Sequence, residues 1–161
     1  MNEGLYIFGT GAHARKVFHC ATEAGCVVKA FVDENRDADS PVESLSVMSP
    51  EALRHLVGAG YLFVAIGAGE VRKRLMDEYL ACGWSFPSIV HPKANVAADA
   101  VLEDGVLVAA GALIESGTVV GRGTIVDIGV AIDHDCLIPP FSHLRPGIVC
   151  QPFTQWADKD F

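Results

Sequence analysis

The sequence predicts an α/β N-terminal Rossmann-like domain followed by a parallel β-helix built from hexapeptide repeats. An apolar residue recurs at every sixth position from Val96 to Cys150, and glycine recurs three residues after most of them. The preceding part of the chain instead alternates apolar runs, glycine turns and segments with helical spacing. A period of six matches no helix, whereas short strands joined by tight corners can stack into a triangular prism.

The hexads assign a place to each residue of the expected prism. The fifth position carries a small or β-branched residue, and the fourth carries a residue type that tolerates a tight corner. The third position is expected to point outward, and the first inward. The expected inward column is Val96, Leu102, Val108, Ile114, Val120, Val126, Ile132, Ile138, Leu144 and Cys150, and the glycine corners are 105, 111, 117, 123, 129 and 147.

The N-terminal part has the pattern of a small parallel sheet with covering helices. Each apolar run ends in a polar or glycine turn, and each helical segment follows such a turn. We therefore expect a nucleotide-sugar-binding domain over 1–88 and a short β-helix acyltransferase domain over 89–161. The expected strands are Leu5–Phe8, Val27–Val32 and Tyr61–Ile66, and the expected helices are Arg15–Ala24, a segment capped by Ser49-Pro50, and Glu70–Cys82.

Composition excludes several classes of protein. The chain has 161 residues, is 50% hydrophobic and carries a net charge of −8, so it offers no basic stripe for nucleic acid. No apolar run approaches the roughly 18 residues of a membrane span, and the N-terminus lacks the pattern of a signal peptide. The five cysteines are scattered without a C-x-x-C pair. We expect a cytoplasmic protein without a metal site.

Two glycine turns are candidate ligand-binding elements. Gly9-x-Gly11-x-x-Ala14 lies between a strand and a helix, and Asp33 ends the next strand, which fits a phosphate at a helix N-terminus and a carboxylate on a ribose or base. The alternative is a tight turn beside a solvated carboxylate. So few strands follow that a mononucleotide or nucleotide sugar fits better than a dinucleotide. After the second turn, which begins at Gly67, Arg72 can reach a pyrophosphate. The alternative is that Arg72 lies on the solvent-exposed face of a helix.

The hexad from Ile132 carries the residues best suited to catalysis. His134 stands at the outward third position between Asp133 and Asp135, and His143 follows nine residues later. An imidazole oriented by a carboxylate can take a proton from an amine or hydroxyl near neutral pH. A lone surface histidine is more often inert, so the alternative is a solvated side chain.

Four motifs in order carry a resemblance to a known family. They are Phe8–Ala14, Phe31–Asp33, Val64–Gly67 with Arg72, and Ile132–Cys136 with Phe141–His143. Together they resemble the sugar O- and N-acyltransferases of the sialic acid O-acetyltransferase and bacillosamine-pathway acetyltransferase group, and the resemblance covers about residues 4–150.

The resemblance implies a homotrimer of left-handed β-helices with active sites between neighbouring subunits. It implies an acetyl-CoA-dependent acetyltransferase that acts on a nucleotide-linked or nonulosonic sugar in surface polysaccharide biosynthesis. His134 is then the general base, Asp135 orients it, and His143 lies near the thioester of acetyl-CoA. The residues expected around the sugar or nucleotide are Gly9, Thr10, Gly11, His13, Asp33, Gly67 and Arg72.

Two features depart from the family pattern. The chain ends where such enzymes continue for further coils that hold CoA, and proline stands at 139, 140, 146 and 152, where it offers no N–H. The family would place a glycine amide near 152 for the acyl oxygen. A second hypothesis is therefore a catalytically weak or inactive relative that binds a nucleotide sugar without productive CoA binding. A nicotinamide-dependent oxidoreductase would rest on Gly9-x-Gly11 alone. The sequence names neither the sugar nor the acylated atom.

Overall fold

The structure is a computed structural model that describes residues 4–35, 37–56 and 60–156. The chain divides into two compact units, Met1–Pro87 and Ser88–Phe161. The first is an α/β sandwich and the second a left-handed parallel β-helix, so the predicted fold class is confirmed.

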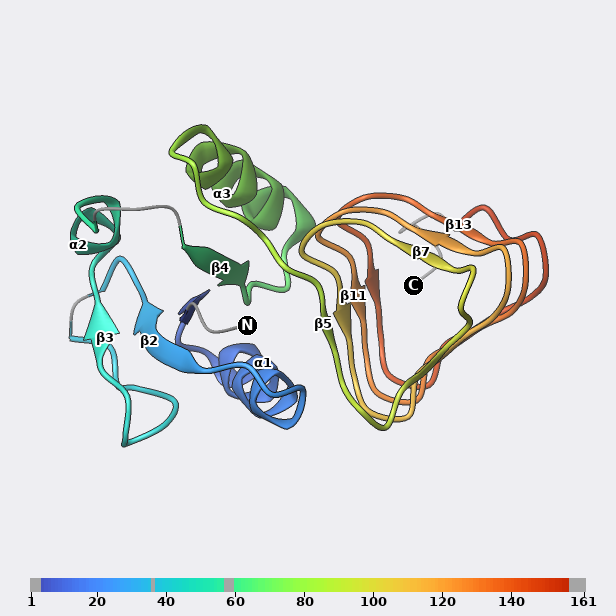
Figure 1. The fold of residues 1–161 in the computed structure, drawn as a ribbon, viewed down its shortest axis with the longest axis horizontal. Helices are drawn as coiled ribbons and strands as arrows, with labels where there is room; N and C mark the ends of the chain where they lie inside the picture. The colour runs from blue at the N-terminus through green and yellow to red at the C-terminus, as the bar shows by residue number, and fades with distance from the viewer. Residues whose placement is uncertain (1–3, 36, 57–59, 157–161) are drawn as a thin grey trace. The chain divides into compact units, whose positions relative to one another are not determined.

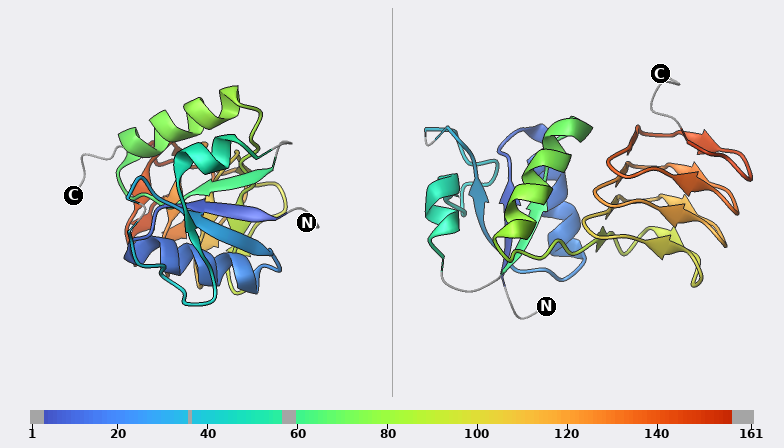
Figure 2. Two further views of the ribbon diagram at one scale, coloured as in Figure 1. Left: turned by 90° about the vertical axis from the view of Figure 1, so that its left-hand side faces the viewer. Right: turned by 90° about the horizontal axis from the view of Figure 1, so that it is seen from above.

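The first unit is built on a four-stranded parallel sheet of order β3-β2-β1-β4. Figure 2 shows α1 and α3 on opposite faces of this sheet, which explains why the strands carry apolar side chains on both faces. The strands are β1 (Leu5–Phe8), β2 (Val28–Val32), β3 (Val47–Met48) and β4 (Tyr61–Val64), and the helices are α1 (Ala12–Glu23), α2 (Pro50–Arg54) and α3 (Gly69–Ala81).

Local sequence explains where these helices begin. The hydroxyl of Ser49 accepts a hydrogen bond from the Ala52 N–H, and Pro50 fills the first position of α2, as the sequence predicts. Helix α1 begins three residues earlier than expected, at Ala12, because Gly11 takes the extended N-cap conformation directly after the glycine turn. The carboxyl ends of β1, β2 and β4 therefore run straight into the turns that carry the candidate ligand residues.

Over its described residues, 88–156, the second unit coils through eleven short strands that form three parallel ladders. Figure 1 looks down the triangular coils, and Figure 2 shows them stacked as rungs. The ladders run β7-β10-β13, β5-β8-β11-β14 and β6-β9-β12-β15. The strands are β5 (Ile89–Val90), β6 (Asn95–Val96), β7 (Val101–Leu102), β8 (Leu107–Val108), β9 (Leu113–Ile114), β10 (Val119–Val120), β11 (Ile125–Val126), β12 (Ala131–Ile132), β13 (Leu137–Ile138), β14 (His143–Leu144) and β15 (Val149–Cys150).

The prism interior is the aliphatic column that the hexads predict. First-position residues from Val108 to Cys150 are at most 3% exposed, and fifth-position residues such as Val106 and Val130 fill the corners. Trp156 joins this core in place of the next aliphatic residue, with its N–H donating to the Leu137 carbonyl. Burial of these side chains is the main stabilising contribution of the unit.

The hydrogen bonds between coils explain why proline is tolerated here. Rungs are joined by the N–H groups of the second, fourth and sixth hexad positions, for example Asp133, Asp135 and Leu137. The third-position N–H groups of His134 and Ile128 donate instead to the preceding aspartate, within their own corner. The third-position prolines 140, 146 and 152 therefore stand at positions whose N–H groups make no backbone bond between coils, whereas Pro139 stands at a second position and lacks the donor found there in other coils.

Candidate active site

The first glycine turn brings two of the predicted ligand residues into direct contact. The hydroxyl of Thr10 donates to Asp33 Oδ2 over 2.7 Å, and the Asn35 N–H donates to Asp33 Oδ1 over 3.0 Å. These bonds hold the carboxylate at the shared edge where β1 and β2 end. Gly9 has φ +110°, and a side chain there would meet the Ala65 carbonyl at 3.1 Å, so only glycine suits this position.

The remaining N-terminal candidates lie around the same edge of the sheet. Gly11 is exposed at the N-cap of α1, His13 is half-buried in its first turn, and Gly67 is exposed after β4. Parallel strands of an open α/β sheet commonly bind ligands at this edge. We refer to this edge of the sheet, formed by Gly9, Thr10, Gly11, His13, Asp33 and Gly67, as the ledge. It combines glycine turns with one carboxylate that hydrogen bonds hold in place.

Arg72 has a different environment from the exposed helix face that was one reading of the sequence. It is 1% exposed, and its guanidinium donates to the carbonyls of Ile66 and Gly67 over 2.6 and 3.0 Å. A buried cation on two carbonyl oxygens fixes the course of the second glycine turn. Arg72 therefore supports the ledge from within, and its contact with a pyrophosphate stays a prediction.

In the β-helix, one corner presents His134 to solvent beside its carboxylate. Imidazole Nδ1 lies 2.8 Å from Asp135 Oδ2, and the two side chains are 46% and 53% exposed. In the tautomer that donates Nδ1–H to Asp135, Nε2 carries the lone pair and faces away from the bond. The corner therefore holds an imidazole that a carboxylate orients.

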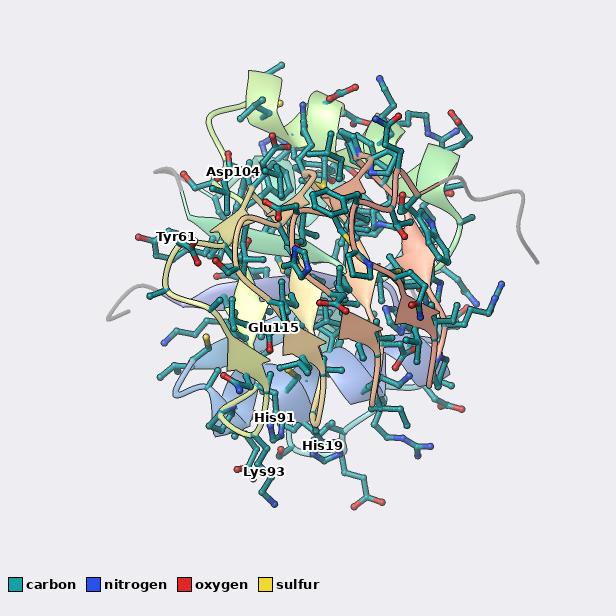
Figure 3. The ribbon with its side chains drawn as sticks, turned by 90° about the vertical axis from the view of Figure 1, so that its right-hand side faces the viewer. His19, Tyr61, His91, Lys93, Asp104 and Glu115 are labelled. Carbon is teal, nitrogen blue, oxygen red and sulfur yellow. The ribbon has the colours of Figure 1, made fainter. Side chains whose placement is uncertain are left out.

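The surrounding charges favour the protonated imidazole. The hydrogen bond that the ring donates to Asp135 raises the pKa of His134 above its usual value and outweighs the opposing effect of desolvation, and the charges of Asp133, Asp135 and Glu115 add smaller increases. Glu115 follows β9 on the outer face of the β-helix that Figure 3 presents. A raised pKa makes Nε2 a stronger proton acceptor once the ring is neutral.

A buried hydroxyl from the coil below fixes the turn that carries His134. Thr118 Oγ1 donates to the Asp133 carbonyl over 2.9 Å and accepts the Cys136 N–H over 3.2 Å. Thr118 is fully buried, so both ends of the turn are tied to the prism interior. The sequence signal was a polar residue at an inward fifth position, and its role was missed.

A groove lies directly beside this corner. Its volume is about 260 Å³, and Glu115, Asp133, Val149 and Cys150 contribute to its walls, together with Leu113, Ala131 and Ile132. The aliphatic walls come from β9, β12 and β15, and Glu115 and Asp133 supply the acidic part of the lining. The groove can receive an extended, partly apolar group beside Asp133, the residue that precedes His134.

His143 pairs with a carboxylate that the sequence analysis did not single out. Its Nε2 lies 3.5 Å from Oδ2 of Asp127, whose side chain is 4% exposed and whose Oδ1 accepts the Ile128 N–H over 2.7 Å. Asp127 occupies the second position of its hexad, as Asp133 does. That shared position was the available signal, because a second-position aspartate accepts the next N–H in both corners.

Residues 4–35, 37–56 and 60–156 contain no group of three or more His, Cys, Asp or Glu side chains placed to hold a metal ion. No helix within those ranges has the length and apolar character needed to cross a membrane.

Comparison with known proteins adds the family. Residues 4–79 match the PglD N-terminal domain. PerB from Caulobacter crescentus, in complex with CoA and GDP-perosamine, is 33% identical, and the match covers 91% of this chain and 70% of PerB with a TM-score of 0.84. The chain belongs to the sugar acetyltransferase family. The resemblance inferred from the four motifs is confirmed.

Two further solved structures support the assignment to the sugar acetyltransferase family. The acetyltransferase domain of PglB from Neisseria gonorrhoeae FA1090, in complex with acetyl coenzyme A, is 28% identical over 92% of this chain and 73% of that domain, with a TM-score of 0.82. A variant of perosamine N-acetyltransferase from Caulobacter crescentus, in complex with CoA and GDP-perosamine, is 29% identical over 92% and 74% of the two chains, with a TM-score of 0.76.

Proposed function

We propose that this protein transfers the acetyl group of acetyl-CoA to an amino or hydroxyl group of a nucleotide-linked or nonulosonic sugar. The observation that carries the proposal is the 2.8 Å bond between His134 Nδ1 and Asp135 Oδ2 on an exposed corner. Support also comes from PerB, which was solved with CoA and a GDP-linked sugar. Cytoplasmic synthesis of a surface polysaccharide is the setting that fits these substrates.

His134 acts as the general base in this proposal. Nε2 takes the proton of the acceptor amine or hydroxyl while that nitrogen or oxygen forms a bond to the thioester carbonyl carbon. The carbon–sulfur bond then breaks, the acetyl group stays on the sugar, and CoA leaves as the thiol after receiving a proton. Asp135 keeps Nδ1–H pointed away, so that Nε2 is the basic atom.

The acyl donor is assigned to the groove beside the corner. Its aliphatic walls, including Val149, suit a pantetheine chain. The pair of His143 and Asp127, which lies at the β11–β14 ladder outside this groove, is a separate candidate contact to acetyl-CoA. The nucleotide of the acceptor is assigned to the N-terminal ledge. Thr10 orients Asp33 for a ribose or base, with Gly9, Gly11, His13 and Gly67 around it.

We expect the active form to be a homotrimer. Val101 and Leu137 stand one coil apart from Val119 on a single ladder, and they are 51% and 50% exposed; Val149 on another ladder is 63% exposed. Exposed aliphatic ladders on a rigid prism favour burial against other copies of the chain. Light scattering of the purified protein tests the trimer.

One observation favours a second candidate function, a weak or inactive relative. Pro152 occupies the coil above His134, eighteen residues on, and has no N–H to offer an acyl oxygen. Loss of an oxyanion donor reduces rates by roughly 10²–10³. Such a protein would bind the nucleotide sugar and turn it over slowly or not at all.

A thiol-release assay separates the two candidates. The protein is incubated with acetyl-CoA and a panel of UDP- and GDP-linked amino sugars, and free CoA is measured. Release that is lost in His134→Ala but kept in His19→Ala, an exposed histidine of α1, supports the transferase. Absence of release, together with a nucleotide-sugar-dependent rise in melting temperature, favours the binding protein instead.

A further inference from the structure

The carboxylate that orients His134 lies over a glycine of the coil below. Gly117 and Asp135 occupy the same corner in successive coils, and the Asp135 N–H donates to the Ser116 carbonyl over 2.9 Å. A β-carbon built on Gly117 would come within 2.5 Å of Asp135 Oδ1 and 3.3 Å of its Cγ. No side chain fits at 117 while the carboxylate keeps this position.

This close approach does not follow from the glycine conformation, because it is absent at other corners with the same backbone. Gly117, Gly129 and Gly147 have φ of +70°, +65° and +76°, so a side chain at any of them is strained. A β-carbon on Gly129 or Gly147 nevertheless meets nothing within 4 Å. The crowding at Gly117 therefore arises from Asp135 itself.

The two carboxylate oxygens of Asp135 have different neighbours. Oδ2 reaches the imidazole Nδ1 of His134, and Oδ1 lies over Gly117. Asp135 also adopts φ +57°, a conformation that non-glycine residues seldom take. Because the carboxylate is planar and short, displacing Oδ1 also rotates or shifts Oδ2.

We propose that Gly117 is a positioning residue for the general base and acts through Asp135. Because Gly117 has no side chain, the Asp135 carboxylate has room to lie over the corner and accept the hydrogen bond from the imidazole. This inference rests on the proposed role of His134.

Three carboxylates influence His134, and only one of them depends on Gly117. Asp135 hydrogen-bonds the ring, whereas Asp133 and Glu115 act through their charge. Displacement of Asp135 should lower the pKa of His134 toward its ordinary value and release the preference for one tautomer. Activity should then begin at lower pH but reach a lower plateau, by about 10- to 100-fold, because the base is no longer held in place.

The test compares Gly117→Ala with Gly129→Ala, which imposes the same backbone strain without the contact. The imidazole of His134 is titrated by NMR in both variants, and kcat/KM for acetyl transfer is measured against pH. We expect a lowered pKa and a reduced plateau in Gly117→Ala alone. Equal titration curves and equal rates in the two variants would overturn the proposal.

A double variant keeps the test decisive if Gly117→Ala folds poorly. Asp135→Gly removes the carboxylate and restores glycine at the corner, so adding Gly117→Ala should then lower the melting temperature only as much as Gly129→Ala does. If Gly117→Ala remains equally disruptive without Asp135, Gly117 does not act through it. The NMR titration needs no turnover, so a failure of acetyl transfer in the wild type rejects the proposed function while the positioning role is still measured.

Discussion

The ring of Phe153 packs edge to face against the imidazole of His134, with centroids 5.2 Å apart and planes at 85°. Phe153 belongs to the coil above, has φ +60° and donates its N–H to the His134 carbonyl. Phe141 has the same relation to Arg122, whose guanidinium carbon lies 5.3 Å from the ring centroid, and it also has positive φ. A phenylalanine at the corner position thus covers the outward residue of the coil below.

Replacing each phenylalanine by glycine should separate its effect on stability from its effect on activity. In a left-handed conformation a non-glycine residue is strained by about 1–2 kcal/mol, and both Phe153→Gly and Phe141→Gly remove this strain. The gain offsets the loss of the ring contact, so the unfolding midpoint of both variants should stay near that of the wild type. Only Phe153→Gly should reduce kcat/KM, by about threefold to tenfold, because only His134 loses a packing partner. Equal activity of the two variants in the thiol-release assay would argue against this role.

The His134–Asp135 pair should make stability depend on pH in a known direction. Because the pKa of His134 is raised in the folded state, the protonated ring stabilises the fold below its unfolded pKa of about 6.5. That contribution is lost as pH rises through the higher folded pKa. Urea unfolding of wild type and Asp135→Asn should differ most at acid pH and converge at alkaline pH. Asp104→Asn, at an exposed corner, serves as the control.

Asp127 should affect acetyl-CoA more than the sugar. Asp127→Asn keeps an oxygen for the Ile128 N–H but removes the charge facing His143, so we expect KM for acetyl-CoA to rise several-fold with little change in kcat. Asp127→Ala should also lower the free energy of unfolding by about 1 kcal/mol, because it removes the acceptor of the Ile128 N–H. Steady-state kinetics with each substrate varied in turn tests this prediction. A change in KM that is confined to the sugar would contradict the assignment.

Arg72 distinguishes a supporting role from direct ligand binding. Arg72→Met should destabilise the first unit by about 2–4 kcal/mol, because the Ile66 and Gly67 carbonyls lose a charged donor. Lys73→Met removes only an exposed pair with Asp77 and should change stability by less than about 1 kcal/mol. Unchanged melting of Arg72→Met, with loss of nucleotide-sugar binding by calorimetry, would instead favour contact with the pyrophosphate.

The hexad pattern was sufficient to predict the prism because burial there follows position. Val120 and Ile132 are buried since any aliphatic residue at the first position faces the axis. The outward direction of His134 follows from the same rule. Asp127, Thr118 and Gly117 could not be assigned roles in this way, because their contacts join residues about 15 to 18 positions apart and depend on rotamers. Arg72 was ambiguous because the course of the Gly67 turn decides its burial.

The ladders pair each residue with the one eighteen places later, as Val119 does with Leu137. The length of this unit can therefore change without disruption only in steps of eighteen residues. Removal or duplication of eighteen residues changes the number of complete coils and leaves all three ladders in register. Loss of a single residue would instead turn every later aliphatic side chain toward water. A β-helix of this kind can therefore gain or lose complete coils while the corner that carries His134 keeps its conformation.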